Sequence, residues 1–80
     1  MQGYNVIMVY SPDLLHLLLC KRHQDPYQGL YNLVGGKIEP HETSEQAAYR
    51  ELFEETGIKP EDIVLSHFFD LTYYCISLLM

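Results

Sequence analysis

The sequence predicts a small α/β protein of the α+β kind, in which short strands lie on either side of one amphipathic helix. Three observations predict it: an apolar, β-rich run at Tyr4–Tyr10, a helix with signals at both ends over Thr43–Thr56, and two further strand-like runs at Ile63–Phe69 and Tyr73–Leu79. Of the 80 residues, 48% are hydrophobic and 20% are charged, which is the balance of a globular chain. A chain this short buries a small fraction of its surface, so we expect one domain over residues 1–80.

The first half of the chain is predicted to form three strands. Tyr4–Tyr10 is apolar on both alternating faces, so we expect a strand inside a sheet and covered on both sides. Leu14–Cys20 also has the composition of a buried helix, but it is short and bracketed by polar turn residues, which favours a hairpin strand. Leu30–Val34 is the third strand. The Gly35-Gly36 pair after it predicts a tight strand-to-loop turn, because glycine adopts backbone angles that other residues resist.

The helix over Thr43–Thr56 is marked at both of its ends. Thr43 can cap the first turn while Gln46, three residues later, reaches back to form a capping box. Gly57 suits the left-handed position after a helix, and Ile58 can make the apolar contact that accompanies it. Pro60 then prevents the helix from continuing.

The second set of strands ends abruptly. Ile63–Phe69 and Tyr73–Leu79 are predicted to flank a turn at Asp70-Leu71-Thr72, and the sequence stops at Met80 inside the apolar run. A terminal strand without a neighbour leaves unpaired backbone groups, which natural proteins avoid. Two explanations stay open: a second copy of the chain completes the sheet as a homodimer, or the sequence is the N-terminal portion of a longer domain.

Charge and cysteine usage exclude several classes of function. The formal net charge of −6 argues against binding a nucleic acid polymer, since such binding is driven by Lys and Arg. A phosphate-bearing partner would need a bridging metal. The N-terminus has no basic region before its apolar stretch and no run is long enough to span a bilayer, so we expect a cytoplasmic protein without a membrane partner. Cys20 and Cys75 are expected to be reduced structural thiols, and a zinc site is not indicated.

Three carboxylates share one face of the predicted helix. Glu51, Glu54 and Glu55 follow each other at i, i+3 and i+4 beside the apolar sector, which places them at the edge of a cleft. Like charges at these spacings weaken a helix by a few tenths of a kcal/mol per pair, and bound cations would offset that cost. Mg²⁺ prefers hard oxygen ligands of this kind. The alternative for an isolated acidic helix is a solvated, solubilising face.

The pattern around these carboxylates decides between the two interpretations. Arg50 lies four residues before Glu54 and can hold its carboxylate by a charge-assisted hydrogen bond. The wider spacing is Gly36, five residues, Glu42, seven residues, Arg50-Glu51-Leu52, any residue, Glu54-Glu55, any residue, Gly57 and Ile58. This segment, 36–58, resembles the signature of the Nudix hydrolases (MutT-like proteins) at every defined position, and so many fixed residues are very unlikely to match by accident.

The resemblance covers most of the chain and implies a fold and a site. It implies an α/β/α sandwich around a mixed sheet, of which 1–80 would hold the N-terminal portion with the whole signature. It implies that Glu51, Glu54 and Glu55, with the backbone carbonyl of Gly35, ligate Mg²⁺ or alternatively Mn²⁺, and that Arg50 orients a ligand. The supporting residues would be Glu42 and Gly36, and the candidates for substrate contact are Lys37 beside the glycines and the tyrosines Tyr27 and Tyr31.

The implied reaction is hydrolysis of a nucleoside diphosphate linked to a further group, such as a nucleoside triphosphate, a modified one or a nucleotide sugar. Glu51, Glu54 and Arg50 are the predicted catalytic residues, with Glu51 or Glu54 accepting a proton from the attacking water. Relatives often carry a further acid beyond the signature, and Asp70 is a poor candidate for it. The competing hypothesis is a catalytically incomplete fragment or a nucleotide-binding module, including one that forms a strand-exchanged dimer.

Overall fold

The computed structural model describes residues 3–21 and 30–77 and contains one α-helix and five strands in that part of the chain. Thr43–Thr56 was predicted helical and Tyr4–Tyr10 extended, and both predictions are confirmed. The helix is too short to cross a membrane, as is every other helical segment in the described ranges. The elements are β1 (Tyr4–Tyr10), β2 (Leu19–Lys21), β3 (Tyr31–Lys37), α1 (Ser44–Thr56), the 3₁₀ turn η1 (Pro60–Asp62), β4 (Ser66–Phe69) and β5 (Thr72–Ile76).

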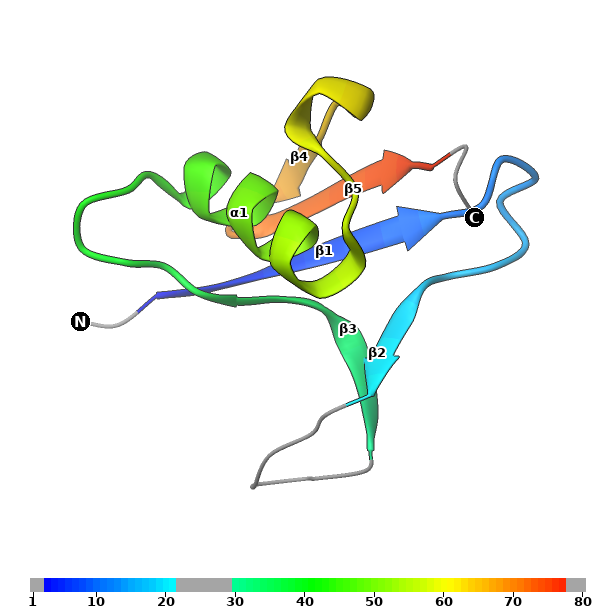
Figure 1. Ribbon diagram of the computed structural model, residues 1–80, viewed down its shortest axis with the longest axis horizontal. Helices are drawn as coiled ribbons and strands as arrows, with labels where there is room; N and C mark the ends of the chain where they lie inside the picture. The colour runs from blue at the N-terminus through cyan, green and yellow to red at the C-terminus, as the bar shows by residue number, and fades with distance from the viewer. Residues whose placement is uncertain (1–2, 22–29, 78–80) are drawn as a thin grey trace.

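The five strands form one mixed sheet in the order β2-β3-β1-β5-β4 (Figure 1). β1 lies in its centre, antiparallel to β3 and parallel to β5. β4 pairs with β5 as an antiparallel hairpin that contains an irregularity between His67 and Phe69. The mixed α/β architecture predicted from the sequence is therefore confirmed, and the described residues supply one helical layer of it.

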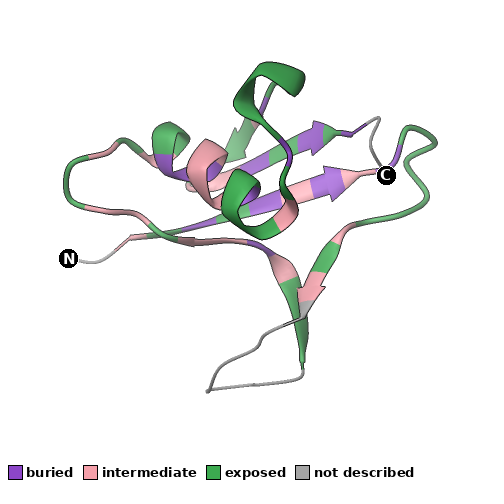
Figure 2. Cartoon of the chain, in the orientation of Figure 1, coloured by how far each residue is buried: buried purple, intermediate pink, exposed green. Residues whose placement is uncertain are grey.

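The core lies between α1 and the face of the sheet that α1 covers (Figure 2). Asn5, Ile7 and Val9 of β1 point into this layer and are buried, whereas Tyr4 and Val6 on the other face are exposed. The expectation that β1 is covered on both sides is wrong for the described residues, because α1 packs on one face only. The buried cluster comprises Ile7, Val9, Val34, Ala48, Leu52, Ile58, Leu65, Tyr73 and Cys75.

Both ends of α1 have the predicted caps. The Thr43 side chain accepts from the Gln46 backbone N–H at 3.1 Å, and the Thr43 N–H donates to the Gln46 side chain at 2.9 Å, which completes the capping box. Gly57 is left-handed, with φ 79°, and its N–H donates to the carbonyl of Phe53. Phe53 itself is 48% exposed, so it lies outside the buried face of α1 that Ala47, Ala48 and Leu52 form.

The predicted strand at Leu14–Cys20 is mostly wrong. Only Leu19–Lys21 is a strand, and Leu17 contributes an isolated bridge to Tyr10. The residues before it form a loop in which side chains satisfy the backbone: the N–H of His16 donates to Ser11 Oγ and the N–H of Leu15 donates to Asp13 Oδ1. Such local hydrogen bonds compete with a strand ladder. Leu14 has φ 64°, outside the extended region.

The glycine pair and the C-terminal strands also differ from expectation. Gly35 and Gly36 lie inside β3, so the predicted turn directly after Val34 is wrong, and the strand ends only at Lys37. The run predicted to be extended from Ile63 is a strand only over Ser66–Phe69, and the one predicted from Tyr73 spans Thr72–Ile76. In both cases the apolar pattern is longer than the paired segment. Residues 78 and 79 of the last predicted strand lie outside the described residues.

We expect Leu52→Ala to lower the free energy of unfolding by about 2–5 kcal/mol, because Leu52 is fully buried between α1 and the sheet and its truncation leaves a cavity. Urea denaturation of both chains measures this loss. Leu15→Ala is the matched control, since Leu15 is 80% exposed. Equal losses in the two variants would contradict the assigned core.

Candidate functional site

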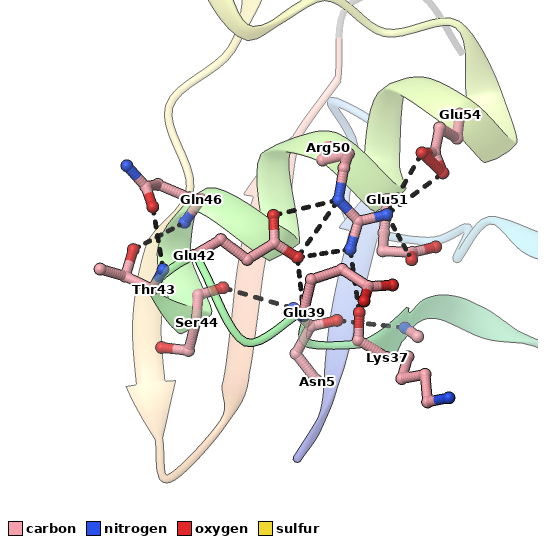
Figure 3. A network of polar contacts seen from close by, with 11 residues as sticks. Asn5, Lys37, Glu39, Glu42, Thr43, Ser44, Gln46, Arg50, Glu51 and Glu54 are labelled. Carbon is pink, nitrogen blue, oxygen red and sulfur yellow. Dashed lines mark hydrogen bonds and ion pairs between the residues drawn. The ribbon is translucent and has the colours of Figure 1, made fainter. Parts of the chain in front are cut away.

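Arg50 is the centre of a network that joins α1 to the segment before it and to β3 (Figure 3). Its Nε donates to both carboxylate oxygens of Glu42, at 3.1 and 3.2 Å, and its Nη2 donates to Glu42 Oε1. The Nη2 group also donates to the backbone carbonyl of Lys37 at 2.9 Å. The guanidinium therefore fixes two segments relative to α1: the chain just before the helix, through Glu42, and the end of β3, through the carbonyl of Lys37.

The Glu42 side chain is also fixed by several hydrogen bonds. Its side chain is 8% exposed, and it accepts from the Glu39 backbone N–H at 2.9 Å in addition to Arg50. The hydrogen bonds from Arg50, followed by the one from Glu39, lower the pKa of the Glu42 carboxyl from 4.5 to about 2. Glu42 is thus an anion at neutral pH, and its hydrogen bonds raise the pKa of Arg50 above the ordinary value.

Glu51 and Glu54 meet the remaining guanidinium nitrogen. Arg50 Nη1 donates to Glu51 Oε1 at 2.9 Å and to the two oxygens of Glu54 at 3.2 and 3.3 Å. One nitrogen touching both groups shows that the two carboxylates lie on the same side of α1, as their spacing predicts. The cation that offsets their mutual repulsion in this structure is Arg50 itself.

The two glycines of β3 let the strand approach the helix and β1 closely. A Cβ on Gly36 would lie 2.8 Å from the carboxyl of Glu51, so the absence of a side chain leaves the space that this carboxylate occupies. A Cβ on Gly35 would come within 2.3 Å of the Asn5 backbone carbonyl, and Gly35 has φ 143°. The Gly35 N–H donates to Glu55 Oε2 at 3.0 Å. All three helix carboxylates therefore face the glycine segment or the guanidinium beside it.

The donor chemistry of this cluster suits a hard divalent cation. Glu51 borders Gly36, Glu55 accepts from the Gly35 N–H, and Glu54 lies with them on the same side of α1. Carboxylate oxygens of this kind are the ligands that Mg²⁺ takes in proteins. Within residues 3–21 and 30–77, no three His, Cys, Asp or Glu side chains already converge in a coordinating arrangement. Glu51 and Glu54 are instead engaged with Arg50.

The structure separates the predicted residues into two groups. Those brought together are Gly35, Gly36, Glu42, Arg50, Glu51, Glu54 and Glu55. Lys37 contributes its backbone carbonyl, while its side chain leads away from the carboxylates (Figure 3). Tyr31 is 65% exposed at the start of β3, outside the hydrogen-bonded cluster. Tyr27 lies outside the described residues.

Sequence reasoning missed two members of the network. Asn5 accepts from the Gly36 N–H at 3.1 Å, and Glu39 supplies the backbone N–H that fixes Glu42. A signal for Asn5 was available, since it is the polar residue in an otherwise apolar strand run. Glu39 acts through its backbone, which no side-chain pattern reports.

Comparison with known proteins identifies the family. The family model that describes the NUDIX domain matches residues 1–75 of this sequence. The chain belongs to the NUDIX family. Among its relatives, the NAD-capped RNA hydrolase NudC of Haemophilus influenzae is 39% identical over 70 residues, covering 76% of this chain and 26% of the relative. The ADP-ribose pyrophosphatase of Methanocaldococcus jannaschii is 47% identical over 45 residues, covering 56% of this chain and 27% of the relative.

Solved structures agree with this assignment. A MutT/nudix family protein from Listeria innocua superposes with a TM-score of 0.69 at 28% identity, covering 91% of this chain and 62% of that one. A MutT structure from work on Aliivibrio salmonicida and Vibrio cholerae gives a TM-score of 0.65 at 31% identity, covering 94% and 61%. The NUDIX chain thus spans about a quarter of the two named relatives and about three fifths of these two solved structures.

The lowered pKa of Glu42 predicts a pH-dependent contribution to stability. Its folded-state pKa lies below the ordinary 4.5, so the stabilisation is fully present above pH 4.5 and is lost as the pH falls toward about 2. Measured between pH 7 and pH 2, the difference in unfolding free energy between the natural chain and Glu42→Gln should shrink over that range. Glu61→Gln, at an exposed position of η1, serves as the control. A constant difference for Glu42→Gln would contradict its pairing with Arg50.

Gly36→Ala is expected to displace the Glu51 carboxylate, because the new Cβ would overlap it and the end of a glutamate side chain can move. The carboxyl ¹³C chemical shift of Glu51 reports the displacement. Gly57→Ala is the matched control: it strains a left-handed backbone by about 1 kcal/mol but has nothing within 4 Å, so it should lower stability and leave that shift unchanged. The assignment of Gly36 fails if its variant behaves like the control.

Proposed function

We propose that this NUDIX protein hydrolyses the diphosphate of a nucleoside diphosphate-linked substrate with the help of Mg²⁺, which Mn²⁺ could replace. The observation that carries the proposal is the organisation of Glu51 and Glu54 by Arg50 beside the glycine segment of β3. Relatives named as an NAD-capped RNA hydrolase and an ADP-ribose pyrophosphatase support the reaction class. We infer a nucleotide as partner and a cytoplasmic location; no contact with a membrane is required.

In this proposal the helix carboxylates and the glycine segment bind the cation. Glu51, Glu54 and Glu55 would hold it with the carbonyl of Gly35, and Mg²⁺ when bound would neutralise phosphate charge and lower the pKa of water. Arg50, fixed on Glu42, keeps the carboxylates on one side of the helix and limits the rotamers they lose on binding. Glu51 or Glu54 would accept the proton of the attacking water, and both stand within the same hydrogen-bonded cluster.

The substrate class is inferred from the diphosphate linkage. ADP-ribose and the NAD cap of RNA, the substrates in the names of two relatives, both contain such a linkage. The net charge of −6 favours a small nucleotide over a nucleic acid polymer for this chain. Lys37 and Tyr31 remain the proposed substrate contacts, since both are exposed at the two ends of β3.

We expect Glu54→Gln to lower Mg²⁺-dependent release of a nucleoside monophosphate from ADP-ribose, NAD or a nucleoside triphosphate by at least about 100-fold, because a neutral amide is a poor ligand and cannot accept a proton. Glu45→Gln, an exposed acid in the first turn of α1, is the control and should retain turnover.

The outcome separates the proposal from its rival. Unchanged turnover in Glu54→Gln would contradict the assigned site. Binding of Mg²⁺ and nucleotide without turnover in the natural chain would favour a binding module or an incomplete hydrolase, and a molecular mass of two chains in that case would favour a strand-exchanged dimer.

A further inference from the structure

Asn5 places a polar side chain in the buried layer between β1 and α1. It is 3% exposed and points the same way as Ile7 and Val9, the neighbouring inward residues of the strand. Burying an amide group costs free energy unless its donor and acceptor are both bonded. The hydrogen bonds of the Asn5 side chain therefore indicate the structural role that offsets this cost.

Both ends of the Asn5 amide bond to backbone groups of the candidate site (Figure 3). Its Oδ1 accepts from the Gly36 N–H at 3.1 Å, and its Nδ2 donates to the carbonyl of Ser44 at 3.3 Å. Gly36 borders the Glu51 carboxylate, and Ser44 begins α1. One side chain thus connects the glycine strand to the helix that carries the carboxylates.

A second contact anchors the same turn of α1. Ser44 Oγ and Tyr73 Oη are 2.5 Å apart, which ties the start of the helix to β5. The start of α1 is thus bonded to β1 through Asn5 and to β5 through Tyr73. Asn5 also bonds to Gly36 of β3. Two contacts therefore set the separation between Gly36 and α1: the Asn5 side chain, which bonds to both, and Arg50, which bonds to the neighbouring carbonyl of Lys37.

We propose that Asn5 is a positioning residue, which sets the distance between Gly36 and α1 and so the place of the Glu51 carboxylate. This inference rests on the proposed function, because it assigns Asn5 a role in binding the cation and in turnover. Asn5 touches neither reacting atoms nor carboxylates; it acts through the backbone of Gly36 and Ser44.

The test compares Asn5→Leu with Ile7→Val in the full chain. Leucine has a similar branched shape but can bond to neither the Gly36 N–H nor the Ser44 carbonyl, whereas Ile7→Val perturbs the same strand and the same core without touching either group. Three quantities are measured: Mn²⁺ affinity by electron paramagnetic resonance, hydrogen exchange of the Gly36 amide, and kcat and KM for ADP-ribose with Mg²⁺.

For Asn5→Leu we expect faster exchange at Gly36, Mn²⁺ affinity lower by about 10-fold to 100-fold, and a fall in kcat of similar size with KM little changed. Ile7→Val should leave all of these near the natural values. If Asn5→Leu does not fold, Asn5→Ala carries the test: it removes both hydrogen bonds without adding bulk or a buried charge, so the same losses are expected.

Two results would overturn the proposal in distinguishable ways. If the natural chain binds Mn²⁺ and turns over substrate, and the Asn5 variants match Ile7→Val, then Asn5 only fills the core and the proposed function stands. If the natural chain neither binds Mn²⁺ nor turns over substrate, the proposed function fails first, and the positioning role fails with it.

Discussion

The arrangement of the candidate site depends on one ion pair, that of Arg50 with Glu42. Three donor contacts join these two side chains, and the geometry leaves a further guanidinium nitrogen directed at Glu51 and Glu54. Charge-assisted hydrogen bonds of this kind restrict orientation as well as contributing energy. Because Glu42 precedes the helix and Arg50 lies within it, the pair also fixes how the chain enters α1.

This ion pair lets a short helix carry three acidic groups on one side. In a protein with a net charge of −6, a stripe of carboxylates on a helix of 13 residues would otherwise be a source of repulsion. Arg50 provides the balancing charge, and the glycines of β3 provide the room. The guanidinium of Arg50 thus supplies the charge balance for Glu51 and Glu54, and the glycine backbone of β3 supplies the space beside the helix.

The parts of the structure that the sequence predicts well are those decided locally. The caps of α1 follow from residues within one turn of each end, and the carboxylate face follows from helical spacing. Pairings between distant segments are less accessible: whether Gly35 and Gly36 continue a strand or leave it depends on β1, which lies far away in the sequence. The loop before β2 was mistaken for a strand because its leucines look buried, yet Leu14 and Leu15 are exposed. Asn5 was overlooked because its partners in β3 and α1 are distant in the sequence and are known only once those elements lie beside β1.

The parallel pairing of β1 with β5 joins the two ends of the described chain in the middle of the sheet. Val6 aligns with Thr72 and Tyr10 with Ile76, so the central ladder forms only after nearly all of the chain is available. Contacts of such large sequence separation slow folding, because a long loop must close before they form. During synthesis on a ribosome, α1 and its acidic face would therefore emerge well before the central strand pair that supports them can form.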